Sequence, residues 1–350
     1  MKSSLVFAHN FPKAKDIGDE VLVIYDQILA KRSKDFQKWI QSFPLSYPVS
    51  AGEELKSVAA FPKHISSIVK ICENASSRKL KVLAIGGGSV GDFAGFVASI
   101  LKRGVGLVHM PSTWLAAIDS AHGGKTALNV GGAKNQIGTF YPAEKIFLVK
   151  KLLLAQPAVR SFEGFGELLK ISIIQGGVLW KQLSQNREIT HDVLWKHLKA
   201  AIEAKNRVVQ KDPEEKSGHR HLLNLGHTVG HVFEADGQIP HGVAINYGLS
   251  FALQWSLEKK IMSQSVYNKM MSAAVMGYLL SPHRDQLIST SPSKIKKYRS
   301  LLLSDKKKTQ TETVRFIFVK APGQCVIQEV GVDDILNEMC RQAEEEDIDG

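Results

Sequence analysis

Three histidines in the second half of the chain have the spacing of metal ligands. His227 and His231 are four residues apart, and His241 follows an Asp-Gly turn and a proline. Residues i and i+4 share one face of a helix, so the first two imidazoles can reach a single cation and the third can fold back toward it. Three imidazoles, or two with a carboxylate, and an open position are typical of a catalytic zinc site. The alternative is a pair of helix histidines that hydrogen-bond only to backbone.

A glycine-rich turn in the first half could bind a dinucleotide. Gly86, Gly88 and Gly91 match the pattern GxGxxG, between an apolar run at 81–85 and a helical pattern at 93–102. Such a turn lets the backbone approach a pyrophosphate at the positive end of a helix. Because no acidic residue ends a strand about 20 residues later, a Rossmann-related but different arrangement is favoured over the usual one. A purely structural turn is the alternative.

The elements around these residues indicate two kinds of domain. Apolar runs at 21–25, 81–85 and 105–109 predict parallel strands, and an amphipathic stretch at 53–72 predicts a crossover helix. We therefore expect an α/β dinucleotide-binding domain with a mostly parallel sheet at 1–156, and a mostly helical metal- and substrate-binding domain at 157–350. In the second domain we expect helices at 162–174, 178–183, 192–210, 222–235, 243–259, 265–280 and 333–341, and a hairpin of strands 314–319 and 324–328.

Composition narrows the class of protein. The 350 residues carry a formal charge of +11, but Lys and Arg are spread along the chain, which argues against nucleic acid and fits an anionic small substrate. Three scattered cysteines form neither a disulfide framework nor a metal cluster. The sequence shows no signal peptide or membrane-spanning segment, so we expect a cytoplasmic protein.

Together these motifs resemble 3-dehydroquinate synthase, a family of the sugar-phosphate cyclase superfamily. The resemblance covers about residues 50–320 in the same order and with nearly the same spacing. It is carried by the following segments: 52–56 (Gly-Glu-Glu-Leu-Lys), 86–92 (Gly-Gly-Gly-Ser-Val-Gly-Asp), 103–104, 111–113, 119–120, 123–126 (Gly-Gly-Lys-Thr), 134–141, 167–170 (Glu-Leu-Leu-Lys), 220–231, 241–242 and 305–307.

The resemblance implies a role for each matching residue. It makes Glu167, His227 and His241 ligands of Zn²⁺ or Co²⁺, and His231 a proton-transfer group that faces the substrate. The implied NAD-binding residues are Glu53, Lys56, Gly87, Gly88, Asp92, Ser112, Thr113, Asp119, Ser120 and Lys134. The implied phosphate-binding residues are Lys125, Asn135, His231 and Lys307 or Lys306, with Arg103 contributed by the second subunit of a homodimer, and Lys170 lies between the metal and phosphate regions. The implied substrate-carboxylate residues are Lys205, Arg220 and Asn224.

The implied reaction converts 3-deoxy-D-arabino-heptulosonate 7-phosphate, an anionic phosphorylated sugar acid, into 3-dehydroquinate and phosphate in the shikimate pathway. NAD takes a hydride from C5, phosphate is eliminated, the hydride returns, the ring opens and an aldol step closes the carbocycle. NAD is thus a catalyst rather than a consumed substrate. Positioning and charge stabilisation would supply much of the acceleration.

Some positions depart from the family pattern. His122 stands where a small aliphatic residue is usual, the 129–134 loop is altered, and Val243 replaces a glutamate that could support the metal site. These departures leave three alternatives: a cyclase acting on another sugar phosphate, a metal-dependent NAD polyol dehydrogenase, and a non-catalytic NAD-binding protein. The first has no use for a carboxylate-binding trio, and the second none for the anion-binding Lys125, Lys170 and Arg220.

Overall fold

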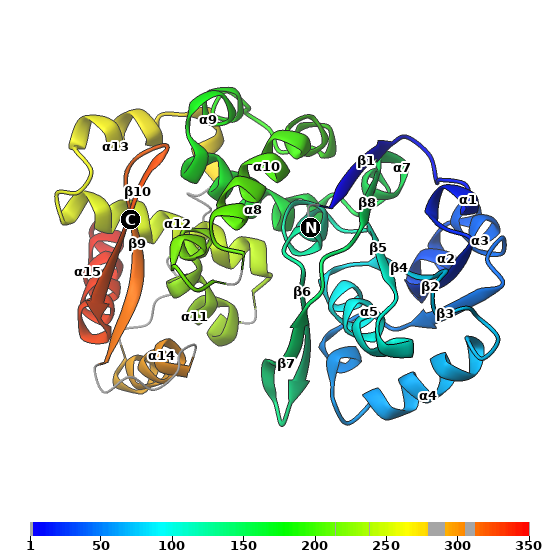
Figure 1. Cartoon of the computed structure of the whole chain (residues 1–350). Coiled ribbons are helices and arrows are strands. Elements are labelled where there is room, and N and C mark those ends of the chain that lie inside the picture. Colours follow the sequence, from blue (N-terminus) through cyan, green and yellow to red (C-terminus); the bar gives the residue numbers. More distant parts are fainter. Residues whose placement is uncertain (1–2, 214, 238, 279–290, 305–311, 350) are drawn as a thin grey trace. The chain divides into compact units, whose positions relative to one another are not determined.

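The computed structural model describes residues 3–213, 215–237, 239–278, 291–304 and 312–349. The chain forms two compact units, Met1–Gly164 and Phe165–Gly350. The first is built on a parallel sheet and the second is mostly helical, as predicted (Figure 1). The domain boundary predicted at 156/157 stays a prediction.

A six-stranded parallel sheet forms the centre of the first unit. Its strand order is β1-β8-β5-β4-β2-β3, with every neighbouring pair parallel. The three strands predicted from apolar runs correspond to β2, β4 and β5. The strands are β1 (Ser4–Ala8), β2 (Glu20–Asp26), β3 (Leu45–Val49), β4 (Leu80–Gly86), β5 (Gly106–Pro111) and β8 (Lys145–Val149).

Both faces of this sheet are covered by helices, which is why its strands are apolar on both sides. On one face, Phe36 and Ile40 of α3 pack in a cluster with Val23 and Leu83. On the other face α5 lies against β4 and β5, with Phe93 fully buried. The helices of this unit are α1 (Ala14–Ile17), α2 (Gln27–Arg32), α3 (Lys34–Ile40), α4 (Phe61–Ile71), α5 (Gly88–Ile100), α6 (Trp114–Ile118) and α7 (Lys150–Leu154), with 3-10 turns η1 (Glu53–Lys56), η2 (Leu101–Arg103) and η3 (Ser120–His122).

One local feature differs from the sequence-based expectation, and a second was not anticipated from the sequence. The single helix predicted over 53–72 is interrupted between η1 and α4, because Ser57 is extended and Pro62 begins a new helix. The polar stretch that follows α6 forms an antiparallel hairpin, β6 (Lys125–Val130) with β7 (Ala133–Phe140), outside the main sheet. The hairpin turns through Gly131 and Gly132, both at positive φ.

The second unit packs its helices around α12, which is buried along most of its length. A hairpin of β9 and β10 lies on this helix, with Trp255 of α12 against Phe316 and Phe318 of β9. Within the described residues no helix is both long and apolar enough to cross a membrane. The elements are α8 (Val159–Gln175, which begins in the first unit), α9 (Gly177–Leu183), α10 (His191–Lys211), η4 (His219–Asn224), α11 (His227–Gly237), α12 (His241–Glu258), α13 (Gln264–Met271), η5 (Ala274–Tyr278), α14 (Pro292–Ser304), β9 (Thr313–Ala321), β10 (Gln324–Gly331) and α15 (Val332–Asp349).

Candidate functional site

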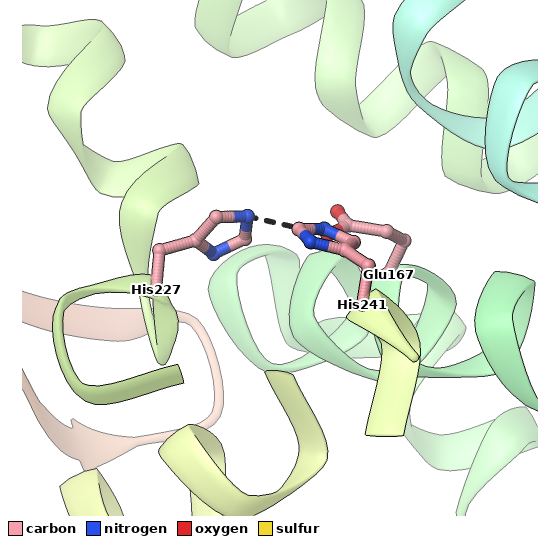
Figure 2. A group of neighbouring side chains, drawn as sticks. All are labelled: Glu167, His227 and His241. Carbon is pink, nitrogen blue, oxygen red and sulfur yellow. Dashed lines mark ion pairs between the residues drawn. The ribbon is translucent and has the colours of Figure 1, made fainter. Parts of the chain in front are cut away.

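Three helices of the second unit bring Glu167, His227 and His241 together (Figure 2). Glu167 lies on α8, and the two histidines are the first residues of α11 and α12. The Nε2 atoms of His227 and His241 lie 3.4 and 3.5 Å from the same carboxylate oxygen, Oε1 of Glu167. The helix of 222–235 predicted from sequence begins only at His227, because the 3-10 turn η4 ends at Asn224 and Gly226 adopts a φ of +77° before the helix starts.

These separations match the donor set of a tetrahedral zinc site. Two ligand atoms bound about 2.0–2.1 Å from one ion lie about 3.3–3.4 Å apart at the tetrahedral angle. Glu167 is fully buried, and its Oε1 has no hydrogen-bond partner, which would be costly in the absence of a cation. The residues present therefore fit a divalent metal held by one carboxylate and two imidazoles.

Each imidazole has a second partner that fixes its tautomer. A carbonyl or a carboxylate only accepts, so the Nδ1 atom facing it must donate. Nδ1 of His227 donates to the Leu225 carbonyl at 3.2 Å, and Nδ1 of His241 donates to Oε2 of Glu234 at 2.9 Å. Both Nε2 atoms are thereby directed at Glu167.

The charges around this trio keep its carboxylate ionised. Burial alone would raise the pKa of Glu167, but the adjacent Lys170 ammonium and the two histidine side chains hold it well below its ordinary value. Burial and Lys170 lower the pKa of His227 to about 4, so that this imidazole is neutral. Burial would lower the pKa of His241, but the carboxylates of Glu167 and Glu234 outweigh it and raise the pKa to about 9; a metal that binds Nε2 would displace the proton there. Lys170 and Glu167 form a buried ion pair one turn apart on α8.

Glycines allow the three helices to approach closely enough to form this cluster. A Cβ on Gly166 would lie 2.5 Å from the carbonyl oxygen of Gly242, so α8 and α12 touch beside Glu167 and His241. A Cβ on Gly248 would lie 1.8 Å from the carbonyl oxygen of Gly226, where α12 meets the residue before His227. The cluster thus depends on backbone contacts that other residues would prevent.

Gly166→Ala should separate α8 from α12, because its methyl group would meet a backbone oxygen rather than a flexible side chain. Overpacking of this kind costs about 1–3 kcal/mol, and a shift of Glu167 away from His241 should weaken metal binding. Thermal unfolding and Zn²⁺ titration of the variant measure the two effects. Gly277→Ala is the matched control, because a Cβ there meets nothing within 4 Å; equal losses in both variants would contradict the prediction.

His231 lies beside the trio but outside it. Its ring centroid is 5.2 Å from that of His227 and 6.1 Å from that of His241. It can also be grouped with Glu234 and His241 as a second set of potential ligands. The three histidines expected from spacing are therefore close together, while Glu167 joins only two of them. The substrate-facing role of His231 stays a prediction.

The three residues assigned to a substrate carboxylate lie on neighbouring elements of the second unit. Lys205 is buried on α10, and Arg220 and Asn224 belong to η4, which packs against α10. Arg220 donates from Nη1 to the Pro213 carbonyl at 2.9 Å, and its Nε lies 3.3 Å from Glu215. Asn224 is exposed, with its amide 3.3 Å from Nδ1 of His221.

Asp212 holds the loop that carries Arg220. Its carboxylate accepts backbone hydrogen bonds from Ser217 at 3.0 Å and Arg220 at 3.1 Å. Burial would raise the pKa of Asp212, but these hydrogen bonds outweigh it and lower the pKa to about 2.

A carboxyl group whose pKa is lower in the folded than in the unfolded protein stabilises the fold at pH values above its unfolded-state pKa. This stabilisation is lost as the pH falls toward the folded-state pKa. Asp212→Asn should therefore flatten the loss of stability between pH 3.8 and about 2. Urea unfolding of the variant and the wild type at several acidic pH values measures the slope. Asp192→Asn, at an aspartate in the first turn of α10, is the control; the same slope in Asp212→Asn and wild type would refute this role.

The glycine-rich turn of the first unit forms the floor of a pocket at the carboxyl ends of β4 and β5. Gly87 and Gly88 begin α5 there, so backbone N–H groups face the opening at the positive end of a 13-residue helix. Of the predicted NAD and phosphate residues, the pocket brings together Gly87, Gly88, Asp92, Ser120 and Lys125. This arrangement can hold a pyrophosphate.

A buried lysine, Lys56, connects segment 52–56, where two of the predicted NAD-binding residues lie, to this pocket. Nζ of Lys56 donates to Asp92 at 2.7 Å and to Asn135 at 2.6 Å, and it lies 3.9 Å from Glu53. Burial raises the pKa of Asp92, an effect that Lys56 only partly offsets. Glu53 in turn accepts from Asn129 at 2.7 Å. Asn135, which the resemblance assigns to phosphate, thus contacts the residues assigned to NAD.

The remaining predicted residues lie at varied positions. Ser112 is buried after β5, Thr113 and Asp119 cap the two ends of α6, and Lys134 is exposed on β7. Arg103 is exposed in the turn after α5, with a φ of +69°. Lys306 and Lys307 lie outside the described residues.

Two histidines of the first unit acquire explanations from the structure. His122 is buried and its Nε2 lies 2.7 Å from the Ala117 carbonyl, so this departure from the family pattern supports the end of α6. His109 lines the pocket beside Gly91, and burial lowers its pKa to about 4, which keeps it neutral. The sequence did not identify His109 as a pocket residue, because it lies in an apolar run that predicts a strand.

Glu234 was also missed, although the signal was present. It lies seven residues after His227 and three after His231, so all three share one face of α11. From the sequence, a supporting acid was expected only at position 243, where the chain has valine. The structure shows an acid reaching His241 from the neighbouring helix instead.

Two family models match consecutive parts of the chain. Residues 46–163 match the 3-dehydroquinate synthase N-terminal family, and residues 164–308 match the 3-dehydroquinate synthase C-terminal family. The two matches meet where the structure divides into its two units.

Curated relatives carry the same description. The chain is 34% identical over 327 residues to a bifunctional shikimate kinase/3-dehydroquinate synthase of Thermotoga maritima, and the match covers 92% of this chain and 62% of that protein. It is 41% identical over 206 residues to a 3-dehydroquinate synthase of Lactiplantibacillus plantarum, covering 57% of this chain and 56% of that one. With the enzyme of Bacillus pumilus it shares 37% identity over 82% of this chain and 77% of the relative.

Solved structures share the whole fold. A 2-epi-5-epi-valiolone synthase from Streptomyces hygroscopicus with NAD⁺ and Zn²⁺ bound superposes with a TM-score of 0.82 at 18% identity, over 99% of this chain and 98% of that one. A 2-deoxy-scyllo-inosose synthase complexed with carbaglucose-6-phosphate, NAD⁺ and Co²⁺ gives 0.76 at 22% identity, over 96% and 95%. At these identities the likeness establishes the fold alone.

Proposed function

The chain belongs to the 3-dehydroquinate synthase family, and from that premise we propose that it converts 3-deoxy-D-arabino-heptulosonate 7-phosphate into 3-dehydroquinate and phosphate. The observation that carries this proposal is the convergence of Glu167, His227 and His241 at coordination distances. The same chain also carries a strand, glycine-rich turn and helix that can hold a dinucleotide.

The cofactors that fit these two sites are NAD and a divalent metal, Zn²⁺ or Co²⁺. Bound NAD would supply reversible hydride transfer, and bound metal would supply acidification of a substrate hydroxyl. Glu167, His227 and His241 would hold the metal. The dinucleotide would lie over the N-terminus of α5, with Glu53 and Lys56 on its adenosine side.

The residues of this chain would divide the remaining work. Lys170 keeps Glu167 ionised within the buried cluster, so that a carboxylate would be available to the metal. His231 lies close enough to the trio to move a proton at the substrate. Lys125 would face the phosphate as a point charge. Lys205, Arg220 and Asn224 would bind the substrate carboxylate.

One assay tests the function. The purified chain is given the heptulosonate phosphate with NAD and Zn²⁺, and phosphate, dehydroquinate and NADH absorbance are followed together. We expect equal amounts of phosphate and dehydroquinate, no lasting NADH, and arrest by a chelator. Lasting NADH with a simple polyol and no phosphate release would indicate a dehydrogenase instead. Turnover of a non-carboxylated sugar phosphate alone would indicate another cyclase.

We also propose a homodimer in which Arg103 reaches the partner's phosphate site. This proposal is supported by the position of Arg103, which is exposed in the turn after α5. Lys102 and Arg103 both have a positive φ, so the turn has a defined conformation and presents two basic side chains at the surface. Mixing an Arg103→Ala chain with a chain inactivated at His227 tests this. Because each mixed dimer would regain one site with both residues intact, activity should recover on mixing; an unchanged sum of the two would contradict it.

A further inference from the structure

We propose that Glu234 is the positioning residue of the metal centre, holding His241 so that only its Nε2 can bind the ion. The inference rests on the proposed metal at Glu167, His227 and His241. Oε2 of Glu234 accepts the Nδ1 hydrogen bond of His241 at 2.9 Å, while Nε2 of the same ring faces Glu167 at 3.5 Å. The imidazole is thus held between two carboxylates, one on each nitrogen.

The contact joins two neighbouring helices. Glu234 lies on α11 and His241 is the first residue of α12. The side chains are partly buried, with 29% of Glu234 and 26% of His241 exposed, and a hydrogen bond between them is shielded in part from water.

The carboxylate does more than hold the ring. Because an ionised carboxylate only accepts, it fixes the proton on Nδ1 and leaves the Nε2 lone pair available for a metal. It also makes Nε2 of the imidazole a stronger electron-pair donor to a metal, as carboxylates paired with metal-binding histidines generally do. His227 has a backbone carbonyl rather than a carboxylate at its Nδ1, so the two imidazoles are supported by different groups.

This assignment explains how the centre tolerates Val243. Val243 stands where a glutamate after His241 could have supported the metal site. Glu234 on α11 accepts the hydrogen bond from Nδ1 of His241. His241 is therefore supported by a carboxylate although position 243 has no glutamate.

A competing arrangement uses the same atoms. His231, Glu234 and His241 lie close enough to form a second metal site. In that case His241 would bridge two ions and Glu234 would be a ligand. The two arrangements predict different metal stoichiometries, one ion per chain for a positioning role and two for a ligand role.

The test is metal titration of the demetallated full-length chain with Zn²⁺ by calorimetry, and with Co²⁺ by visible absorption, which reports coordination geometry. We expect one ion per chain in the wild type. Glu234→Ala should weaken Zn²⁺ binding about 10–100-fold with one ion still bound and an altered Co²⁺ spectrum. Glu234→Gln, which keeps an acceptor oxygen without the charge, should fall between. Glu258→Ala, at an exposed glutamate at the end of α12, is the matched control and should bind as wild type.

Three results would overturn the inference. Equal Zn²⁺ affinity in Glu234→Ala and wild type would show that His241 needs no support. Two ions in the wild type and one in Glu234→Ala would make Glu234 a ligand. Circular dichroism and the control variant identify general unfolding, and a Gln variant as weak as the Ala variant with the native Co²⁺ spectrum would indicate a merely structural role. Absence of any metal binding by the wild type would instead overturn the metal centre of the proposed function itself.

Discussion

His227→Ala is expected to abolish tight Zn²⁺ binding and to lower the rate of phosphate release by roughly a thousandfold or more. The variant leaves Glu167 with one imidazole instead of two, and a metal that acidifies a hydroxyl supplies several kcal/mol of stabilisation, each 1.36 kcal/mol being a factor of ten in rate. Metal content after dialysis and phosphate release under saturating substrate measure the two effects.

The matched control for this change is His9→Ala, which removes an exposed histidine of the first unit. It should retain full metal content and activity. Truncation at His227 should also leave the fold intact, because this imidazole is neutral and donates only one hydrogen bond, to the Leu225 carbonyl. Phosphate release that persists in a metal-free His227→Ala enzyme would refute the role of the trio.

Arg220→Ala is expected to lower kcat/KM for the carboxylated sugar phosphate by about a hundredfold, chiefly through KM. A hydrogen bond to a charged group contributes about 1.5–3 kcal/mol, and the guanidinium can offer two. Because Arg220 also binds the Pro213 carbonyl and Glu215, its removal should loosen that loop as well. Steady-state kinetics and thermal unfolding separate the two contributions.

Two comparisons make this prediction specific. Arg220→Lys keeps the positive charge but not the planar fork, so we expect it to recover only part of the lost affinity. Arg187→Ala removes an arginine elsewhere in the second unit and should leave KM unchanged. An Arg220→Ala enzyme with wild-type KM would remove the assignment of a substrate carboxylate to this residue, while leaving the metal centre untouched.

The sequence could predict those parts of the site that depend on local pattern. A buried strand, three closely spaced glycines and a helix form together in β4 and α5, so that the pocket follows from neighbouring residues. The parallel sheet and the helical second half were likewise predictable from apolar periodicity. The local pattern gave a wrong prediction at 53–72, where contacts with a distant segment interrupt the helix. Asn129 of the β6–β7 hairpin donates a hydrogen bond to Glu53 and forms a β-bridge with Ser57, the residue after η1.

The sequence by itself determined which chemistry is available. It supplies the carboxylate of Glu167, three histidines, and a set of lysines and arginines in the order of a known family. Tertiary structure decided how those groups are shared. Spacing made His227, His231 and His241 look equivalent, but the turn at Gly226 and the glycine contacts between α8, α11 and α12 place Glu167 against only two of them. The remaining nitrogen of His241 meets Glu234 across two helices. Ligand geometry is fixed to fractions of an ångström by such helix packing, which no local pattern encodes.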